Sequence, residues 1–211
     1  PTNSKIRMAC INSKEIKKND IFFAIKGKKN DGNLFLKEAI NKGASLAVVS
    51  RTNKFVKKNK QIKVKNSLDF LTKASKIVRA NSNGTIIAIT GSCGKTSLKE
   101  LLAKVLGKFG RVTFSPRSFN NKFGVPLSLF NLNPSHKYGI FEVGMDKKGE
   151  IDRLSKIIKP DIGIITNISY AHAKNFKNIK QIAQAKAEII NNINDGGILV
   201  LNADDQFFNL H

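Results

Sequence analysis

The sequence is poor in cysteine and holds no long apolar run. Only Cys10 and Cys93 occur among 211 residues, too few for a disulfide framework. This points to a reducing compartment, so we expect a cytoplasmic protein. No apolar stretch approaches the roughly 18 residues of a membrane span, and the polar start of the chain has no apolar signal core. Export and stable membrane insertion are therefore not expected.

Acidic residues are also scarce, because 15 Asp and Glu stand against 37 Lys and Arg and give a formal net charge of +22. Such an excess is common in proteins that bind nucleic acid. However, only six of the basic residues are Arg, and the lysines are spread along the whole chain. Lys, Asn and Ile together are what an AT-rich genome encodes without selection for a partner. A solvated surface is favoured, and no nucleic-acid partner is expected.

Hydrophobic residues make up 41% of the chain, enough for packed cores. Short β-branched or aromatic runs alternate with longer segments of helical spacing, which is typical of an α/β fold with a mostly parallel sheet. The predicted strands are residues 21–25, 46–50, 62–64, 85–90, 112–114, 139–143, 161–166 and 198–201. The predicted helices are residues 34–41, 67–80, 95–109, 149–158 and 178–193.

The helix expected at residues 95–109 has the clearest apolar stripe. Its spacing of i, i+3, i+4, i+7, i+8 and i+11 predicts a buried face made of Leu98, Leu101, Leu102, Val105, Leu106 and Phe109. The polar segment 80–84 is the best candidate for a domain boundary. We therefore predict a small N-terminal α/β domain at residues 1–80, followed at residues 84–211 by an incomplete P-loop-type sheet with flanking helices.

A glycine-rich loop precedes this helix and follows a predicted buried strand. Its backbone N–H groups and the helix N-terminus can hold phosphate, Lys95 can reach the terminal phosphates, and the Thr96 hydroxyl can bind Mg²⁺. The spacing departs from the common P-loop pattern, because Gly91 lies only three residues before Gly94. A chance glycine turn is the alternative, but the flanking strand and helix favour nucleotide binding. The expected nucleotide contacts are Thr90, Gly91, Ser92, Cys93, Gly94, Lys95, Thr96 and Ser97.

Three polar residues further along the chain are candidates for the same site. Glu142 lies near the end of the strand expected at residues 139–143, His172 follows the strand expected at residues 161–166, and ligands bind at the carboxyl edge of a parallel sheet. Both are therefore candidate partners of Mg²⁺ and phosphate, although His matches so hard a cation poorly and either could be an ordinary loop residue. Lys186 interrupts the apolar stripe of the helix at residues 178–193. Spacing alone leaves open whether it snorkels to water or enters the site with a lowered pKa or a covalent modification.

Six motifs follow one another along the second predicted domain. They are residues 90–96, 119–126 (Phe-Asn-Asn-Lys-Phe-Gly-Val-Pro), 142–145 with 149–151, 166–168 with 171–172, 185–188 (Ala-Lys-Ala-Glu) and 201–205 (Leu-Asn-Ala-Asp-Asp). In this order they resemble the central domain of the Mur ligases, ATP-dependent amide-forming enzymes of peptidoglycan synthesis. Residues 119–126 are most like the branch that adds D-alanyl-D-alanine. Residues 20–27 with Asp31, Gly32 and Phe35 resemble that branch's uridine-nucleotide-binding domain.

The resemblance implies ligation of D-alanyl-D-alanine to UDP-N-acetylmuramoyl-tripeptide through an acyl phosphate, with ATP and Mg²⁺. It implies that Lys95 holds the β/γ-phosphates, that Thr96 and Glu142 bind one Mg²⁺, and that His172 helps to hold a second. Lys186 would be the family's carbamylated lysine, whose anion can face Mg²⁺. Lys95, His172 and Lys186 are thus the expected catalytic residues. The other residues that the resemblance places near the site are Asn121, Glu188 and Asn202.

Two other hypotheses remain open. One is a Mur-type ligase that adds a different amino acid, and the other is a basic P-loop module that binds nucleic acid. The chain starts without Met and stops at His211, before the rest of the central domain and the C-terminal domain of such ligases. We therefore expect a fragment that does not ligate on its own, and a monomer for the complete enzyme.

Overall fold

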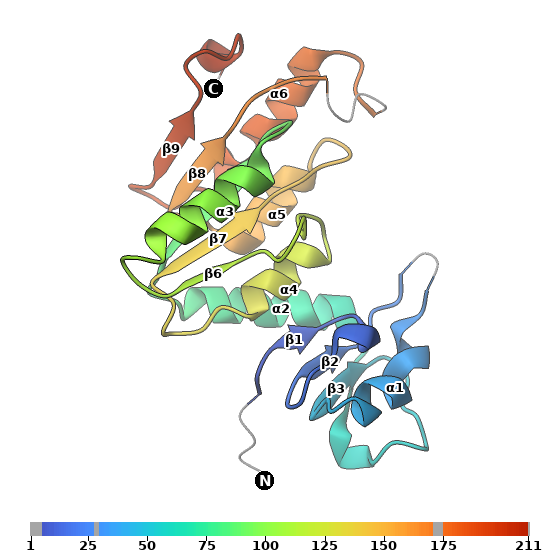
Figure 1. The fold of residues 1–211 in the computed structure, drawn as a ribbon. Helices are drawn as coiled ribbons and strands as arrows, with labels where there is room; N and C mark the ends of the chain where they lie inside the picture. The colour runs from blue at the N-terminus through green and yellow to red at the C-terminus, as the bar shows by residue number, and fades with distance from the viewer. Residues whose placement is uncertain (1–5, 28–29, 171–174, 211) are drawn as a thin grey trace. The chain divides into compact units, whose positions relative to one another are not determined.

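The computed structural model describes residues 6–27, 30–170 and 175–210, which form two compact units, Pro1–Ser75 and Lys76–His211 (Figure 1). Each unit holds a parallel sheet with flanking helices, so the predicted α/β class is confirmed. The division falls inside helix α2 (Ser67–Ala80), slightly before the boundary predicted at 80–84. Within the described ranges, no helix is long and apolar enough to cross a membrane.

The first unit is built on a four-stranded parallel sheet in the order β1-β2-β3-β4. Its core joins Phe22 and Ala47 of the sheet to Leu36 and Ala39 of the helix. Strand β1 was not predicted, because two residues carry no readable alternation. The elements are β1 (Ala9–Cys10), β2 (Ile21–Phe23), α1 (Leu36–Asn41), β3 (Leu46–Val49) and β4 (Gln61–Lys63).

The second unit is built on a five-stranded parallel sheet in the order β6-β7-β5-β8-β9. Strand β5 is central, and its two neighbours, β7 and β8, pair with it on opposite sides. An open sheet that reverses its strand order in this way binds ligands beyond the carboxyl ends of its central strands. The strands are β5 (Thr85–Thr90), β6 (Val112–Phe114), β7 (Tyr138–Glu142), β8 (Ile162–Ile165) and β9 (Ile198–Leu201).

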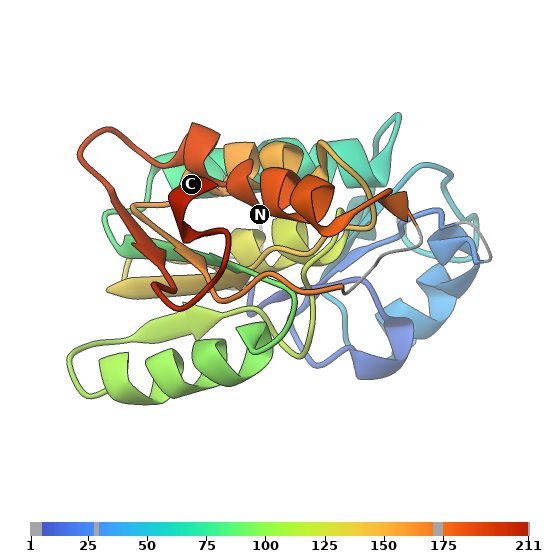
Figure 2. The same cartoon turned by 90° about the horizontal axis from the view of Figure 1, so that it is seen from above.

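Helices cover both faces of this sheet, as Figure 2 shows. Successive side chains of β5 point to opposite faces. Ile86 and Ala88 pack in the core formed with α4, α5 and α6, whereas Ile87 and Ile89 pack with α3. The helices are α3 (Lys95–Leu106), α4 (Gly124–Phe130), α5 (Glu150–Ile158) and α6 (Ile179–Ala187).

The predicted buried stripe of α3 is wrong in part. Leu101, Val105 and Phe109 are 58%, 44% and 64% exposed. The face turned to the sheet instead carries Leu98, Leu102 and Leu106 together with a fully buried lysine, Lys99. The helix is therefore rotated relative to the apolar pattern. This rotation places the Lys99 Nζ 2.8 Å from Glu142 Oε1 inside the protein.

Helix α4 was not predicted, and α6 ends earlier than predicted. Pro126 lies in the first turn of α4, a position where the fixed φ of proline is tolerated. Helix α6 ends at Ala187, and a 3₁₀ turn at Ile190–Asn192 follows within the predicted range 178–193. Both differences concern short segments whose conformation depends on packing.

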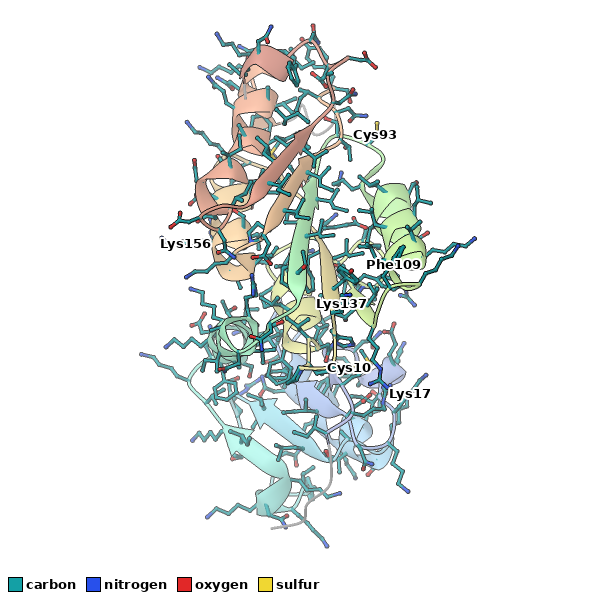
Figure 3. All side chains as sticks on the ribbon, turned by 90° about the vertical axis from the view of Figure 1, so that its left-hand side faces the viewer. Cys10, Lys17, Cys93, Phe109, Lys137 and Lys156 are labelled. Atoms are coloured by element: carbon teal, nitrogen blue, oxygen red, sulfur yellow. The ribbon has the colours of Figure 1, made fainter. Side chains whose placement is uncertain are left out.

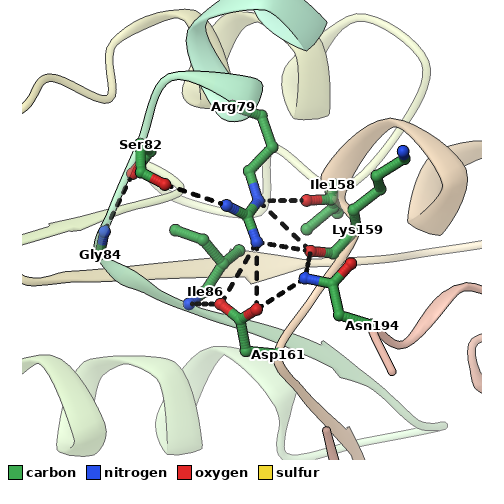
Figure 4. Close-up of polar contacts among 8 residues, drawn as sticks. All are labelled: Arg79, Ser82, Gly84, Ile86, Ile158, Lys159, Asp161 and Asn194. Carbon is green, nitrogen blue, oxygen red and sulfur yellow. Dashed lines mark hydrogen bonds and ion pairs between the residues drawn. The ribbon is translucent and has the colours of Figure 1, made fainter. Parts of the chain in front are cut away.

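A network around Arg79 fixes the amino ends of the central strands (Figure 4). Arg79 donates to the carbonyl oxygens of Ile158 at 2.9 Å and Lys159 at 2.8 Å, and both Asp161 oxygens lie 3.3 Å from its Nη2. The Asp161 carboxylate also accepts from the Ile86 N–H at 2.8 Å and from Asn194 Nδ2 at 2.6 Å. Both charged groups have hydrogen-bonding partners, so we interpret this network, called the Arg79 clasp below, as one that stabilises the fold.

Candidate functional site

The loop between β5 and α3 depends on two glycines. Gly91 has a φ of +143°, and a Cβ there would lie 1.8 Å from Thr166 Oγ1. Gly94 has a φ of +80° and forms the N-cap of α3. Both conformations are in the region that favours glycine. Figure 3 shows Cys93 at this loop and Phe109 beyond the other end of α3.

Residues after β8 hold the loop in place. Thr166 Oγ1 donates to the Cys93 carbonyl at 2.7 Å, and Asn167 Oδ1 accepts from the Cys93 N–H at 3.0 Å. The Ser92 N–H donates to the Asn167 carbonyl at 2.9 Å. Two N–H groups expected to face phosphate are thus bonded to Asn167. The first turn of α3, whose N–H groups lack intrahelical partners, is the remaining anion-binding feature of the loop.

Lys95 lies back over this loop. Its Nζ donates to the carbonyl oxygens of Gly91 at 2.7 Å and Ser92 at 3.3 Å. Burial lowers the pKa of Lys95, and the nearby Glu142 carboxylate opposes that shift. A half-buried ammonium held at the mouth of a phosphate loop can exchange the two carbonyl contacts for a stronger contact with phosphate oxygens. Thr96 follows at the second position of the helix and is half-buried.

Glu142 ends β7 in a fully buried position. Its Oε1 lies 2.8 Å from Lys99 Nζ, but neither carboxylate oxygen accepts a hydrogen bond from the described residues. Thr90 Oγ1, at the end of β5, is likewise buried without a partner in that part of the chain. Buried oxygens without hydrogen bonds are uncommon, and a water molecule or a bound cation is the usual partner of such groups.

The Glu142 carboxylate suits one Mg²⁺ shared with phosphates. The described residues contain no group of three or more His, Cys, Asp or Glu that could cage a metal. Mg²⁺ is typically held by one or two carboxylates together with substrate phosphates and water, so a single buried carboxylate beside a phosphate loop fits it. Glu142 and Thr96 are the described residues that would supply oxygen. The predicted ligand His172 lies outside the described residues.

Lys186 is buried in α6, with 2% of its surface exposed. Burial, followed by the positive charge of Lys95, lowers the pKa of Lys186 to about 7, and Cys93 opposes the shift. The amine is therefore within electrostatic reach of the phosphate loop, although α6 begins more than 70 residues after α3 ends. The degree of burial does not support a snorkelling side chain. The lowered pKa leaves part of the Lys186 amine uncharged near pH 7.

The remaining predicted residues have local structural contacts. Asn121 Oδ1 accepts from the N–H groups of Phe123 at 3.0 Å and Gly124 at 3.1 Å, at the start of α4. Glu188 caps α5 by accepting from the Gly149 N–H at 2.8 Å. Asn202 lines a small pocket with Asn167 and Asp205, beyond the carboxyl ends of β8 and β9. Ser97 is exposed on the first turn of α3.

Sequence reasoning missed Lys99 and the Asn167 contacts. The signal for Lys99 was present, because it interrupts an apolar face as Lys186 does. The exposed positions Leu101, Val105 and Phe109 concealed it by offering a second, more continuous stripe. Asn167 carries no periodic signal at all.

The candidate uridine-binding segment of the first unit is tied to the end of β3. Asn33 Oδ1 accepts from the N–H groups of Ser50 at 3.0 Å and Arg51 at 3.1 Å. Asp31 accepts from Asn33 Nδ2 at 2.7 Å and pairs with Arg51. Hydrogen bonds from Asn33, and then the Arg51 charge, lower the pKa of Asp31. A Cβ on Gly32 would lie 2.7 Å from the Ile25 backbone nitrogen, so this close approach requires glycine.

Family models match both units. The model described as Mur ligase middle domain matches residues 89–211, and the model described as Mur ligase family, catalytic domain matches residues 5–82. A curated relative from Rickettsia prowazekii, UDP-N-acetylmuramoyl-tripeptide–D-alanyl-D-alanine ligase, is 42% identical over 199 residues, covering 94% of this chain and 44% of the relative. The chain thus spans less than half the length of that relative.

Solved structures agree with these matches. A MurF crystal structure from Acinetobacter baumannii has a TM-score of 0.84 and 30% identity, covering 97% of this chain and 45% of that one. MurF from Thermotoga maritima, in complex with ADP, has a TM-score of 0.81 and 32% identity, covering 100% of this chain and 49% of that one. With both units matched in order, the chain belongs to the Mur ligase family.

Proposed function

We propose that this chain forms the uridine-nucleotide-binding and ATP-binding parts of a ligase that joins D-alanyl-D-alanine to UDP-N-acetylmuramoyl-tripeptide. The observation that carries the proposal is the grouping of Lys95, Glu142 and Lys186 around one phosphate loop at the carboxyl edge of the sheet. The similarity to the Rickettsia prowazekii ligase and to the ADP-bound Thermotoga maritima structure supports it. We assign the uridine nucleotide to residues 1–80 and ATP to residues 84–211.

In this proposal the substrate carboxylate oxygen attacks the γ-phosphorus of ATP, and ADP leaves. The uncharged amine of D-alanyl-D-alanine then attacks the carbonyl carbon of the acyl phosphate, the C–O bond to phosphate breaks, and the nitrogen loses a proton as the amide forms. Negative charge grows on the phosphoryl oxygens, so a cation fixed beside them lowers the barrier. Lys95 provides that cation from the loop. Glu142 and Thr96 would hold Mg²⁺, which when bound screens the phosphate charge.

Lys186 is proposed to act as a carbamate. Its amine is partly uncharged near pH 7, because burial and Lys95 lower its pKa, and an uncharged amine can add to CO₂ with loss of a proton. The resulting carbamate is an anion with two oxygens and can face Mg²⁺. Carbamate formation also removes the buried like charge that Lys186 presents to Lys95. His172 and Asn202 remain proposed ligand contacts.

Nucleotide titration of the 211-residue chain tests the proposal. We expect ADP and ATP to bind more tightly with Mg²⁺ than with EDTA, and UMP to bind without competing with ADP. A steep dependence of DNA or RNA binding on salt, together with no nucleotide binding, would instead favour a basic nucleic-acid module. In the complete enzyme, amide formation with D-alanyl-D-alanine but not with other amino acids distinguishes this branch from other Mur-type ligases.

A further inference from the structure

Lys99 is a buried charge that the proposed function does not use. Its side chain is fully buried on the inner face of α3. Its Nζ lies 2.8 Å from Glu142 Oε1 and donates to the carbonyl oxygen of Arg117 at 2.6 Å. The Phe114 ring centroid lies 5.9 Å from the same nitrogen. One side chain thus joins the phosphate-loop helix to the end of β7 and to the loop after β6.

The loop that Lys99 holds has an unfavourable backbone. Arg117 has a φ of +50°, which residues other than glycine rarely adopt. The same loop is fastened to the end of β7 on both sides of Arg117. Ser115 Oγ accepts from the Glu142 N–H at 3.3 Å, and the Asn120 carbonyl accepts from the Gly144 N–H at 2.8 Å. Along the chain, the contact of Lys99 with the Arg117 carbonyl lies between the hydrogen bonds of Ser115 and Asn120.

Glu142 needs a buried cation to stay where it is. A fully buried carboxylate without a counter-charge is strongly unfavourable, and relaxation toward water is the usual response. The Lys99 ammonium supplies the counter-charge at 2.8 Å. Because neither oxygen accepts a hydrogen bond from the described residues, the carboxylate is held by charge while it keeps lone pairs for another cation.

We propose that Lys99 is a positioning residue that holds Glu142, together with the loop at residues 115–120, in the geometry that a divalent cation requires beside the nucleotide phosphates. The proposal rests on the proposed function, since it takes Glu142 as a metal ligand. Lys99 acts through Glu142. Removing its ammonium leaves the carboxylate without its counter-charge, and the carboxylate leaves its position.

Manganese binding to the 211-residue chain tests this. Free Mn²⁺ is followed by electron paramagnetic resonance in the presence of ADP, and ADP affinity is measured separately in EDTA. We expect Lys99→Met to weaken Mn²⁺ binding about tenfold or more, the range found when an outer contact of a metal ligand is removed. ADP affinity in EDTA should change less than about twofold. Lys104→Met, on an exposed position of the same helix, is the matched control and should leave both affinities unchanged.

The sign of the change decides between the possible roles of Lys99. Tighter Mn²⁺ binding in Lys99→Met would show that the ammonium competes with the metal, and unchanged binding would show a purely structural pair; either overturns the proposal. If Lys99→Met does not fold, Lys99→Gln, which keeps a donor for the Arg117 carbonyl, is judged by the same criteria. Glu142→Gln separates the two proposals, because wild-type Mn²⁺ binding in that variant would remove Glu142 as a ligand and the proposed function with it.

Discussion

Buried charged side chains at the two edges of the five-stranded sheet differ in how many hydrogen bonds they make. At the amino edge, Arg79 and Asp161 are enclosed by hydrogen bonds to each other and to five further groups. At the carboxyl edge, Glu142 has a cation but no hydrogen bond within the described chain. Lys186 is buried with a pKa lowered to about 7. Buried charges with all their hydrogen bonds formed stabilise a fold. Buried charges that lack hydrogen bonds or have a shifted pKa are typical of ligand-binding sites.

The largest effect is expected from Lys95→Ala, at the carboxyl edge. The loop loses the cation that its carbonyl groups hold in place, so ADP affinity of the chain should fall about 100-fold or more, and ligation by the complete enzyme should be lost. Calorimetric titration with ADP measures the change. Lys104→Ala serves as the control, and binding of the uridine substrate should survive, since that site is assigned to the other unit. Equal loss of both ligands would contradict the assignment.

Lys186→Ala should lower the ligation rate of the complete enzyme about 100-fold, because the proposed carbamate no longer supplies an anion at the metal. A small carboxylic acid that fills the vacated space should restore part of the rate. The assay is amide formation at increasing acetate or formate concentration. An unchanged rate in Lys186→Ala would remove the carbamate from the mechanism.

At the amino edge, Arg79→Met should lower the free energy of unfolding of the second unit by about 2–3 kcal/mol, since the backbone carbonyls of Ile158 and Lys159 lose a charged donor. Urea denaturation measures this. Arg153→Met, on an exposed position of α5, removes the same charge and should change stability by less than about 0.5 kcal/mol. A similar loss in both variants would show that net charge, rather than the Arg79 clasp, is responsible.

The smallest effect is expected at Phe109, the member of the predicted apolar stripe that lies just beyond the C-terminal end of α3. Phe109→Ser should change the unfolding free energy by less than about 0.5 kcal/mol, because the ring is 64% exposed. Leu102→Ala, on the face packed against the sheet, should cost about 1–2 kcal/mol in the same denaturation experiment. The reverse order would restore the rotation of α3 that the apolar stripe predicted.

Local patterns predicted the sheets well and the rotation of α3 poorly. Strand β5 and helix α2 have the predicted bounds, because a buried apolar run and a long periodic segment are both locally determined. The phase of α3 depends on the pairing of Lys99 with Glu142, 43 residues later in the chain. No spacing rule separates a lysine that meets a buried carboxylate from one that meets water.

The site shows the same division. Lys95 and the two loop glycines follow from a motif in one segment, and the structure gives both glycines backbone angles that require them. The contacts of Thr166 and Asn167 with the loop bring together segments more than 70 residues apart. They depend on β5 and β8 being neighbours, which only the folded sheet establishes.

The pH dependence of stability in Lys186→Met tests the contrast between the two edges most directly. A lysine with a pKa of about 7 when folded and 10.5 when unfolded binds fewer protons in the folded state between those values. The wild type therefore gains stability as pH rises from 7 to 10.5, and carries the full penalty below pH 7. In CO₂-free buffer at pH 7, Lys186→Met should be more stable than the wild type by about 2–4 kcal/mol. This gain should shrink toward pH 10, opposite in sign to the loss in Arg79→Met. A Lys186→Met variant less stable than the wild type at pH 7, or a difference that does not vary with pH, would contradict the account.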